Sequence, residues 1–304
     1  MNSILDYDIA FIGHYTKDTI ISPAGKRVVD GGAFNYGSHV AIRMGLKVAA
    51  ITRLAPEDYH VVDKLKDLGV DVFLTPSEHS TCLTIEYPTN NVDERILSIT
   101  SFAGPFSLTD VEGISARAFV IGASVRGEIP LEVIEKIREK NALISVDVQG
   151  FMRVNHGGKL VYDNWPEKKH VLMYVDVLKA DAVESEMLTG EKDIKIAARK
   201  LSELGPDEVL ITHQNGVLLY ANNNYYEAEF YPKKLVGRSG RGDTCIAAYM
   251  ARRLTTPPPQ AIVWAAAITS LKMENEGPFQ KSLSEVEELL KNKYYPTDRL
   301  EEET

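Results

Sequence analysis

Short apolar runs with strand character alternate along the chain with segments of helical spacing, and this alternation limits the possible folds more than any other feature. The apolar runs lie at residues 9–12, 48–52, 70–74, 118–121, 143–147, 175–178 and 209–212. The helical segments lie at residues 34–44, 61–68, 130–140, 194–204, 243–254 and 260–273. Strands joined by helices pair in parallel and are covered on both faces. The sequence therefore predicts an α/β fold, a three-layer αβα sandwich around a mainly parallel central sheet.

Glycines mark the ends of three helical segments. Gly45, Gly69 and Gly205 each come directly after such a segment. Glycine adopts the left-handed conformation that commonly follows the last turn of a helix. These glycines therefore predict where the three helices end.

Residues 82–87 and 94–100 interrupt the β–α alternation. Apolar and polar side chains alternate in both segments, and a Pro-Thr-Asn-Asn turn begins at Pro88. This pattern is typical of an antiparallel hairpin. We expect a β-hairpin insertion around residues 81–101 that projects from a single domain of residues 1–304 and forms a small β lid. Because exposed strand edges can pair with another chain, a homodimer through this lid is also possible.

Composition narrows the classes of function. The chain has 304 residues, of which 44% are hydrophobic, and this is enough to bury the core of one large domain. Its net charge of −9 argues against a nucleic-acid partner, because neutralising phosphates requires a basic face. Cys82 and Cys245 are the two cysteines, and their wide separation gives no sign of a disulfide framework or a zinc site.

The apolar runs also argue against a membrane location. A run such as residues 261–268 is far shorter than the roughly 20 residues that span a bilayer. The first residues carry acidic side chains and lack the basic segment of a signal peptide. We therefore expect a cytoplasmic protein with no membrane partner.

A glycine-rich turn at residues 237–243 leads directly into a helix-forming segment. Glycines let the backbone aim successive N–H groups at one point, and the first helical turn adds unpaired donors and the positive end of its dipole. The turn ends at Asp243, a carboxylate that could accept a hydroxyl proton beside this anion site. The alternative is an ordinary loop in which Asp243 caps the helix.

The Gly-x-Gly-Asp sequence that ends at Asp243 resembles the second signature of the ribokinase or PfkB family of carbohydrate and nucleoside kinases. The resemblance implies a ribokinase-like fold and an ATP-dependent kinase that uses Mg²⁺, with Asp243 as the catalytic base. It also implies an anion hole made by the backbone of Gly240, Arg241 and Gly242.

Three residues of this turn depart from the family signature. Gly237 and Arg238 stand where the family usually has Asp-Thr, and Arg241 replaces a small residue. These departures put contacts to metal or phosphate near the start of the turn in doubt. The Arg241 guanidinium could bind a phosphate or the acceptor, or it could pair with an acidic residue on the surface.

Three further segments resemble parts of the acceptor site in this family. The Gly31-Gly32 pair is followed by Asn35 and a helix, which is similar to the family's first signature. Asp18 follows the first strand, as does the family aspartate that binds acceptor hydroxyls. Arg153 follows a later strand, at the edge where open α/β sheets bind ligands. The alternative reading of each is structural.

Other segments resemble the family's metal and nucleotide contacts. Asp181 and Glu184 match a motif that organises Mg²⁺, with Asp181 in place of the usual asparagine, although they could also form a solvated helix face. Thr212 and Gly216 lie in a strand–turn–strand segment that contacts nucleotide phosphates in the family. The family layout places the adenine pocket near Ala266, Ser270 and Gly277.

Together these segments predict phosphoryl transfer from ATP·Mg²⁺ to a hydroxyl of a small polyol, cyclitol, sugar or sugar acid. The segment that begins at Asp147 looks more like the inositol-kinase-like branch than like ribokinase itself. A nucleoside kinase is the alternative, and it would need aromatic stacking, for example from Phe34 or Phe102. A catalytically silent ligand-binding regulator on the same fold is a further alternative, which would bind its ligand without turnover.

Overall fold

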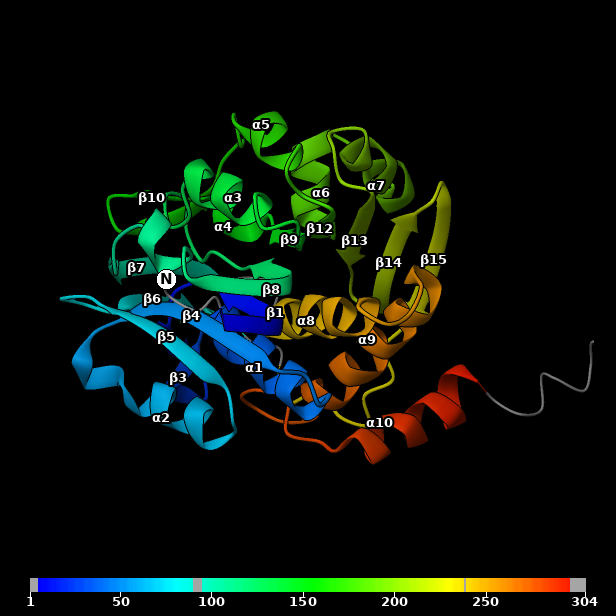
Figure 1. The fold of residues 1–304 in the computed structure, drawn as a ribbon. Helices are drawn as coiled ribbons and strands as arrows, with labels where there is room; N and C mark the ends of the chain where they lie inside the picture. Colours follow the sequence, from blue (N-terminus) through cyan, green and yellow to red (C-terminus); the bar gives the residue numbers. More distant parts are fainter. Residues whose placement is uncertain (1–4, 90–94, 238, 296–304) are drawn as a thin grey trace, which may run out of the picture.

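The structure is a computed structural model that describes residues 5–89, 95–237 and 239–295 (Figure 1). Its central sheet has the strand order β15-β14-β13-β12-β9-β8-β1-β4-β5. The strands are β1 (Leu5–Ile12), β4 (Val48–Leu54), β5 (Asp71–Pro76), β8 (Ile114–Ile121), β9 (Leu143–Asp147), β12 (Val177–Asp181), β13 (Glu208–Thr212), β14 (Gly216–Ala221) and β15 (Asn224–Glu229). Pairing is parallel from β5 to β13, and β14 and β15 add an antiparallel edge. The predicted mainly parallel sheet is confirmed.

Helices cover both faces of this sheet (Figure 1). One layer consists of α1 (Ala33–Arg43), α2 (His60–Asp67), α8 (Arg241–Arg253), α9 (Pro258–Met273) and α10 (Leu283–Leu289). The other consists of α3 (Leu131–Arg138), α4 (Gln149–Met152), α5 (Lys168–Leu172), α6 (Ala182–Thr189) and α7 (Ile194–Ser202). Shorter helical turns lie at Pro56–Asp58, Leu108–Asp110 and Leu290–Tyr294. The predicted three-layer αβα sandwich is therefore confirmed.

The two halves of the core follow from the pleat of the strands. In β1, Ile9 and Phe11 pack against the layer that contains α1 and α8, whereas Ala10 and Ile12 pack against the layer that contains α3 and α7. Successive side chains of a strand point to opposite faces, so a strand covered on both sides must be apolar throughout. This is why the apolar runs predicted the central strands.

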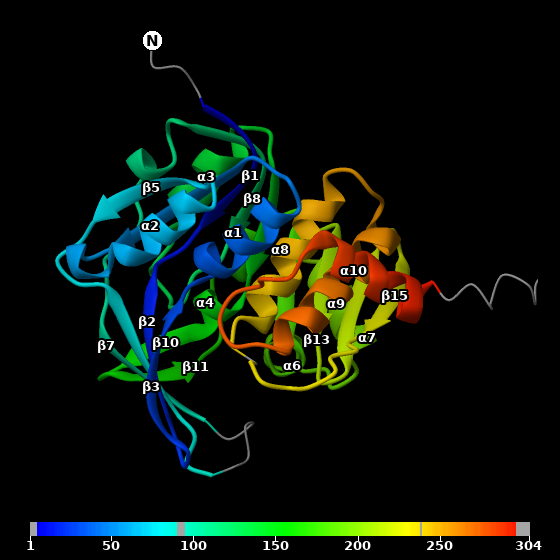
Figure 2. The ribbon, with the colours of Figure 1, turned by 90° about the horizontal axis from the view of Figure 1, so that it is seen from below.

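A second sheet has the order β10-β11-β7-β6-β2-β3. Its strands are β2 (Thr16–Ser22), β3 (Gly25–Gly31), β6 (Thr81–Glu86), β7 (Ile96–Ser101), β10 (Arg153–His156) and β11 (Lys159–Tyr162). Figure 2 shows this sheet on the side of the molecule away from α10 and β15. We call it the lid sheet.

The lid sheet is larger than the predicted hairpin. The strands β6 and β7 pair antiparallel as expected, although Asn90, Asn91 and Glu94 lie outside the described residues. β2 pairs with β6 in parallel and with β3 antiparallel, and β10 and β11 extend the other edge. These additional strands were not predicted: β2 and β3 are rich in polar residues, and β10 and β11 have only four residues each. Closure of the lid sheet and dimerisation through it stay predictions.

Helix ends agree with the glycine positions. Gly45, Gly69 and Gly205 all have positive φ values, of 80°, 89° and 144°, and each follows the end of a helix.

Neither cysteine forms a disulfide in the described part of the chain. Over the same residues, no helix combines the length and the apolar character needed to cross a membrane.

Candidate active site

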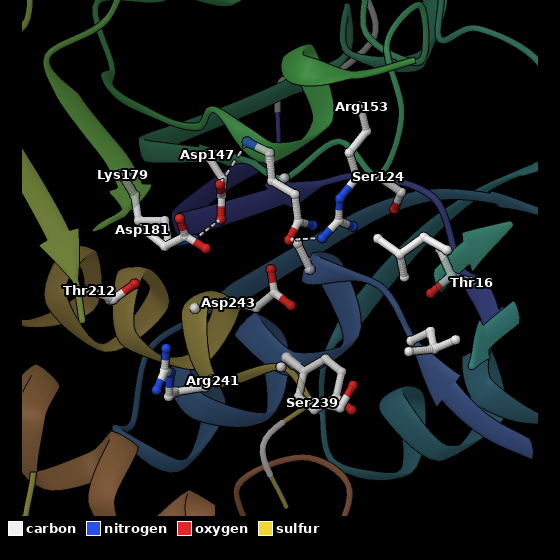
Figure 3. Close-up of a pocket in the computed structure, with 18 of the residues that line it drawn as sticks. Thr16, Ser124, Asp147, Arg153, Lys179, Asp181, Thr212, Ser239, Arg241 and Asp243 are labelled. Atoms are coloured by element: carbon white, nitrogen blue, oxygen red, sulfur yellow. Dashed lines mark hydrogen bonds and ion pairs between the residues drawn. The ribbon is translucent and has the colours of Figure 1, made fainter. Parts of the chain in front are cut away.

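A cavity of about 410 Å³ lies between the lid sheet, the carboxyl ends of β9, β12 and β13, and the first turn of α8 (Figure 3). Open parallel sheets place ligands at this edge, because loops at the carboxyl ends of the strands converge there. The cavity collects most of the predicted site residues: Asp18, Gly32, Arg153, Asp181, Thr212, Gly240, Arg241, Gly242 and Asp243.

The start of α8 is shaped for an anion. Gly240 is the N-cap residue in a left-handed conformation, with φ 73°. A Cβ atom at Gly240 would lie 2.3 Å from the ring of Tyr36, so this turn accepts only glycine. The N–H groups of the first helical turn have no partners within the helix, and the helix dipole adds positive potential. The backbone of residues 240–242 therefore offers donors to a phosphoryl group.

Asp243 lies in the first turn of α8 and faces the cavity (Figure 3). Desolvation by the surrounding protein and, to a smaller extent, the negative charge of Asp147 raise the pKa of Asp243 to about 6. The positive charges of Lys179 and Arg153 oppose this rise. Near pH 7 the group is still mostly a carboxylate, and its proton affinity is higher than that of an ordinary aspartate. This is the property that a general base needs.

Lys179 was missed by sequence reasoning. It lies on β12, almost completely buried, with Nζ 2.8 Å from Oδ2 of Asp147 and 4.0 Å from Oε2 of Glu184. A Cβ atom at Gly242 would lie 2.7 Å from Nζ, so the ammonium is directly beside the backbone of the anion site. A lysine within an otherwise apolar strand is the signal that could have identified it, because lysine is almost never fully buried unless it is paired.

Asp181 and Glu184 form a capping box at the start of α6. Glu184 N–H donates to Oδ1 of Asp181 at 2.8 Å, and Asp181 N–H donates to Oε2 of Glu184 at 2.7 Å. Asp181 lines the cavity, whereas Glu184 is 1% exposed, and burial raises the pKa of Glu184 to about 7. The described residues contain no group of three or more His, Cys, Asp or Glu side chains placed to hold a metal.

Asp18 and Arg153, both predicted to bind the acceptor, line the cavity. Asp18 lies on β2, and within the described part of the chain its buried Oδ1 atom has no hydrogen-bond partner. Burial raises the pKa of Asp18 to about 7, although Thr16 and Arg153 lower it. The Arg153 Nη2 atom donates to Oε1 of Gln149 at 2.7 Å. An unpaired buried oxygen is costly, so Asp18 is ready to accept a hydrogen bond from a hydroxyl.

The glycine pair and the asparagine of the first signature have different roles here. Gly31 allows β3 to approach β2, since a Cβ atom there would lie 2.3 Å from Oγ1 of Thr16. The side-chain amide of Asn35 donates to the Asp30 carbonyl at 3.2 Å, and Asn35 does not line the cavity. The next residue, Tyr36, lines the cavity instead, and its buried hydroxyl has no hydrogen-bond partner among the described residues.

Of the residues predicted to bind the nucleotide, some line the cavity and others lie outside it. Thr212 lines the cavity, but Gly216 begins β14 outside it and accepts a hydrogen bond from His213 N–H. The structure does not bring the predicted adenine residues Ala266, Ser270 and Gly277 to the described wall of the cavity. Ser270 is buried, with its hydroxyl donating to the Ala266 carbonyl at 2.7 Å and accepting from a backbone N–H at 2.9 Å. The Ser270 hydroxyl is therefore engaged in contacts within the protein.

Strands β6 and β7 of the lid sheet contribute apolar side chains to the wall of the cavity. Leu83 and Ile85 of β6 and Leu97 of β7 line this wall. They share one face of the lid sheet because residues two apart in a strand point the same way. The cavity therefore has an apolar patch on the side of β6 and β7, which we call its roof, next to polar side chains.

Comparisons with known proteins agree with this geometry. A model of the pfkB family of carbohydrate kinases matches residues 28–283. A cytidine kinase of Thermococcus kodakarensis is 24% identical over 253 residues, which are 80% of this chain and 87% of that protein. A solved pyrophosphate-dependent kinase of the ribokinase family, complexed with a pyrophosphate analog and myo-inositol, is 34% identical with a TM-score of 0.85, covering 92% of this chain and 99% of its own.

The likeness extends to more distant ribokinases. The ribokinase of Arabidopsis thaliana, complexed with ribose and ATP, is 18% identical with a TM-score of 0.75, covering 94% of this chain and 99% of its own, and this likeness shows the fold alone. The family match over most of the chain confirms the resemblance seen in the sequence, and the 34% identity supports the inositol-kinase-like branch. The chain belongs to the pfkB family of carbohydrate kinases and is a phosphotransferase with an alcohol group as acceptor.

Proposed function

We propose that the protein phosphorylates one hydroxyl of a small cyclitol or a related sugar, with Asp243 as the base. The observation that carries this proposal is the position of Asp243 in one cavity with both an anion site and an unpaired acceptor-side carboxylate. The first residues of α8 and Asp18 line the same cavity as Asp243. A hydroxyl bound by Asp18 would be within the same cavity as a phosphoryl group bound by residues 240–242.

In the proposed reaction, Asp18 and Arg153 hold the acceptor and Asp243 takes the proton of the attacking hydroxyl. The acceptor oxygen forms a bond to the phosphorus while the bond to the leaving phosphate of the donor breaks. Backbone donors at residues 240–242 stabilise the charge on the transferred group, and Lys179 adds a positive charge beside them. The lid sheet excludes water, which would otherwise compete as the nucleophile.

The roof of the cavity favours a ring with one apolar face. Leu83, Ile85 and Leu97 offer no hydrogen bonds, and they suit the C–H face of a cyclitol or sugar ring. The relative that is 34% identical was solved with myo-inositol. A nucleoside acceptor is the alternative: Phe34 and Phe102 are not among the described residues that line the cavity, but the aromatic side chains of Tyr36 and Tyr87 are.

Pyrophosphate is the donor that we favour over ATP. The related myo-inositol complex is pyrophosphate-dependent, and the residues predicted for adenine are outside the described wall of the cavity. Thr212 and Arg241 remain on the donor side, and they suit phosphate oxygens. If Mg²⁺ is required, Asp181 can hold it together with donor oxygens and waters, and Glu184 keeps Asp181 in place. Mg²⁺ would neutralise charge on the donor.

The test is a turnover screen of the purified protein with Mg²⁺ and either pyrophosphate or ATP, against cyclitols, sugars, sugar acids and nucleosides. We expect turnover with pyrophosphate and one cyclitol or related sugar, and loss of that turnover in Asp243→Asn. Turnover with ATP only would reject the donor assignment, and turnover of a nucleoside would reject the acceptor class. Ligand binding without turnover of any acceptor would instead support a regulatory protein.

A further inference from the structure

Lys272 is a buried cation that the proposed mechanism does not use. It lies in the last turn of α9, with 2% of its surface exposed. Its Nζ atom donates to the Gly237 carbonyl at 2.9 Å and also to the Ser239 carbonyl. The same Nζ atom lies 5.3 Å from the centre of the Tyr36 ring. Lys272 is thus held by backbone oxygens and an aromatic ring.

The two carbonyls belong to the loop that leads into the anion site. This loop is also tied to the end of α9, because the N–H groups of Val236 and Gly237 donate to the Met273 carbonyl at 2.9 and 3.1 Å. A Cβ atom at Gly237 would lie 2.1 Å from the Asn275 carbonyl oxygen, so only glycine fits. The departure from the family signature at Gly237 therefore has a structural reason, whereas Arg238 lies outside the described residues.

The contact with Ser239 sets the direction of a donor in the anion site. The carbonyl of Ser239 and the N–H of Gly240 belong to one planar trans peptide and point in opposite directions. When Lys272 holds the Ser239 oxygen on its own side, the Gly240 N–H points away from Lys272. Without a cation, the two carbonyl dipoles would meet with no positive partner.

We propose that Lys272 is a built-in monovalent cation for the transfer reaction: it fixes the Ser239–Gly240 peptide and so orients the anion site. An ammonium group carries the same charge as K⁺, an ion that proteins also bind with backbone carbonyls. This proposal rests on the proposed kinase function. Lys272 is a positioning residue, and the enzyme should need no added monovalent cation.

Burial and the charges around Lys272 predict the pH above which the side chain loses its positive charge. Burial lowers the pKa of Lys272 to about 8, Asp243 and Glu276 oppose the shift, and Arg241 adds to it. The ammonium is therefore charged near pH 7 and loses its proton as the pH rises above about 8. Donor affinity should weaken over that range, because a neutral amine no longer attracts two carbonyl oxygens.

The first test uses the unmodified enzyme. Turnover is measured at constant ionic strength in the chlorides of Na⁺, K⁺, NH₄⁺ and tetramethylammonium, with Mg²⁺ present. We expect rates that agree within about twofold, because the cation position is already filled. Activation of fivefold or more by K⁺ or NH₄⁺ over tetramethylammonium would overturn the proposal.

The second test removes the ammonium. We expect Lys272→Ala to lose roughly 100-fold in kcat, as when one donor of an anion hole is lost, with the acceptor KM little changed. NH₄⁺ or K⁺ should restore at least about tenfold, whereas tetramethylammonium is too large to enter. The matched control is Lys281→Ala, which removes a partly exposed lysine paired with Glu285 and should leave kcat unchanged.

Two further readouts separate this idea from misfolding and from failure of the proposed function. Thermal melting reports whether Lys272→Ala folds, and calorimetry with pyrophosphate reports on the anion site without any acceptor. Full kcat in the variant, or a loss that no cation reverses in a protein that still melts cooperatively, would reject the role of Lys272. A wild type that binds pyrophosphate but turns over no acceptor would reject the proposed function alone.

Discussion

Replacing Lys179 with methionine tests the buried charges beneath the anion site. The Lys179 ammonium is 2.8 Å from Asp147 and 4.0 Å from Glu184, and all three side chains are at most about 5% exposed. Burial lowers the pKa of Lys179, but the charges of Asp147 and Glu184 outweigh this effect and raise it above the ordinary value. The ammonium therefore stays charged throughout the working range of pH. Lys179→Met would leave two carboxylates without their cation.

The expected loss of stability is large. Removing one partner of a buried ion pair costs about 3–5 kcal/mol, because the other charge remains buried and unpaired. For a chain of this size, that loss corresponds to a decrease in melting temperature of roughly 6–15 °C. The double variant Lys179→Met/Asp147→Leu should recover part of the loss, since replacing both members of a buried pair by apolar residues is often nearly neutral.

The loss should also depend on pH. Burial raises the pKa of Glu184 to about 7, and removal of Lys179 takes away the charge that opposes this rise. A carboxyl whose pKa is raised in the folded state favours folding in its protonated form, so the stability of the variant increases as the pH falls. The difference from the wild type should therefore be larger at pH 8 than at pH 5.5.

The assay is urea unfolding of the wild type and the variants at both pH values. Lys200→Met is the matched control, because Lys200 pairs with Glu191 on the surface and should contribute less than about 1 kcal/mol. A loss below about 1 kcal/mol for Lys179→Met at pH 8, or a loss that grows on acidification, would refute this account of the buried charges.

Three further predictions concern the cavity itself. Asp243→Asn should lower kcat by about 10²–10⁴-fold without lowering the melting temperature. The kcat of the wild type should fall as the pH drops below about 6, where Asp243 becomes protonated. A wild-type kcat that does not change between pH 5 and pH 7 would contradict this role. Tyr36→Phe removes an unpaired buried hydroxyl, so it should change stability by less than about 1 kcal/mol, while a rise in the acceptor KM would identify the phenol as a ligand contact. Gly237→Ala should raise the donor KM, because its Cβ would lie 2.1 Å from a backbone oxygen. Gly113→Ala is the control and should have no effect, because a Cβ at Gly113 would meet no atom within 4 Å. Equal kinetics of the two variants would argue against a strained loop.

The local features of the fold were predictable from the sequence. The apolar runs identified the central strands because both faces of that sheet are covered, and this requirement acts on every residue of a strand. The glycine-rich turn before α8 was also readable, since positive φ at Gly240 and the proximity of Tyr36 leave room only for glycine. The position of Asp243 within that turn is fixed by the chain itself.

The tertiary structure decided which polar side chains meet. The lid sheet joins β2 to β6 and β7 to β11, and no short-range periodicity specifies such pairings between distant segments. Lys179 meets Asp147, and Lys272 meets Gly237, across 32 and 35 residues of chain respectively. Sequence patterns report local geometry, whereas the charge, burial and partners of a side chain depend on segments that only folding brings together. The sequence by itself therefore determined the layers of the protein and its glycine-rich turn, and the packing of distant segments determined which buried cations lie beside that turn.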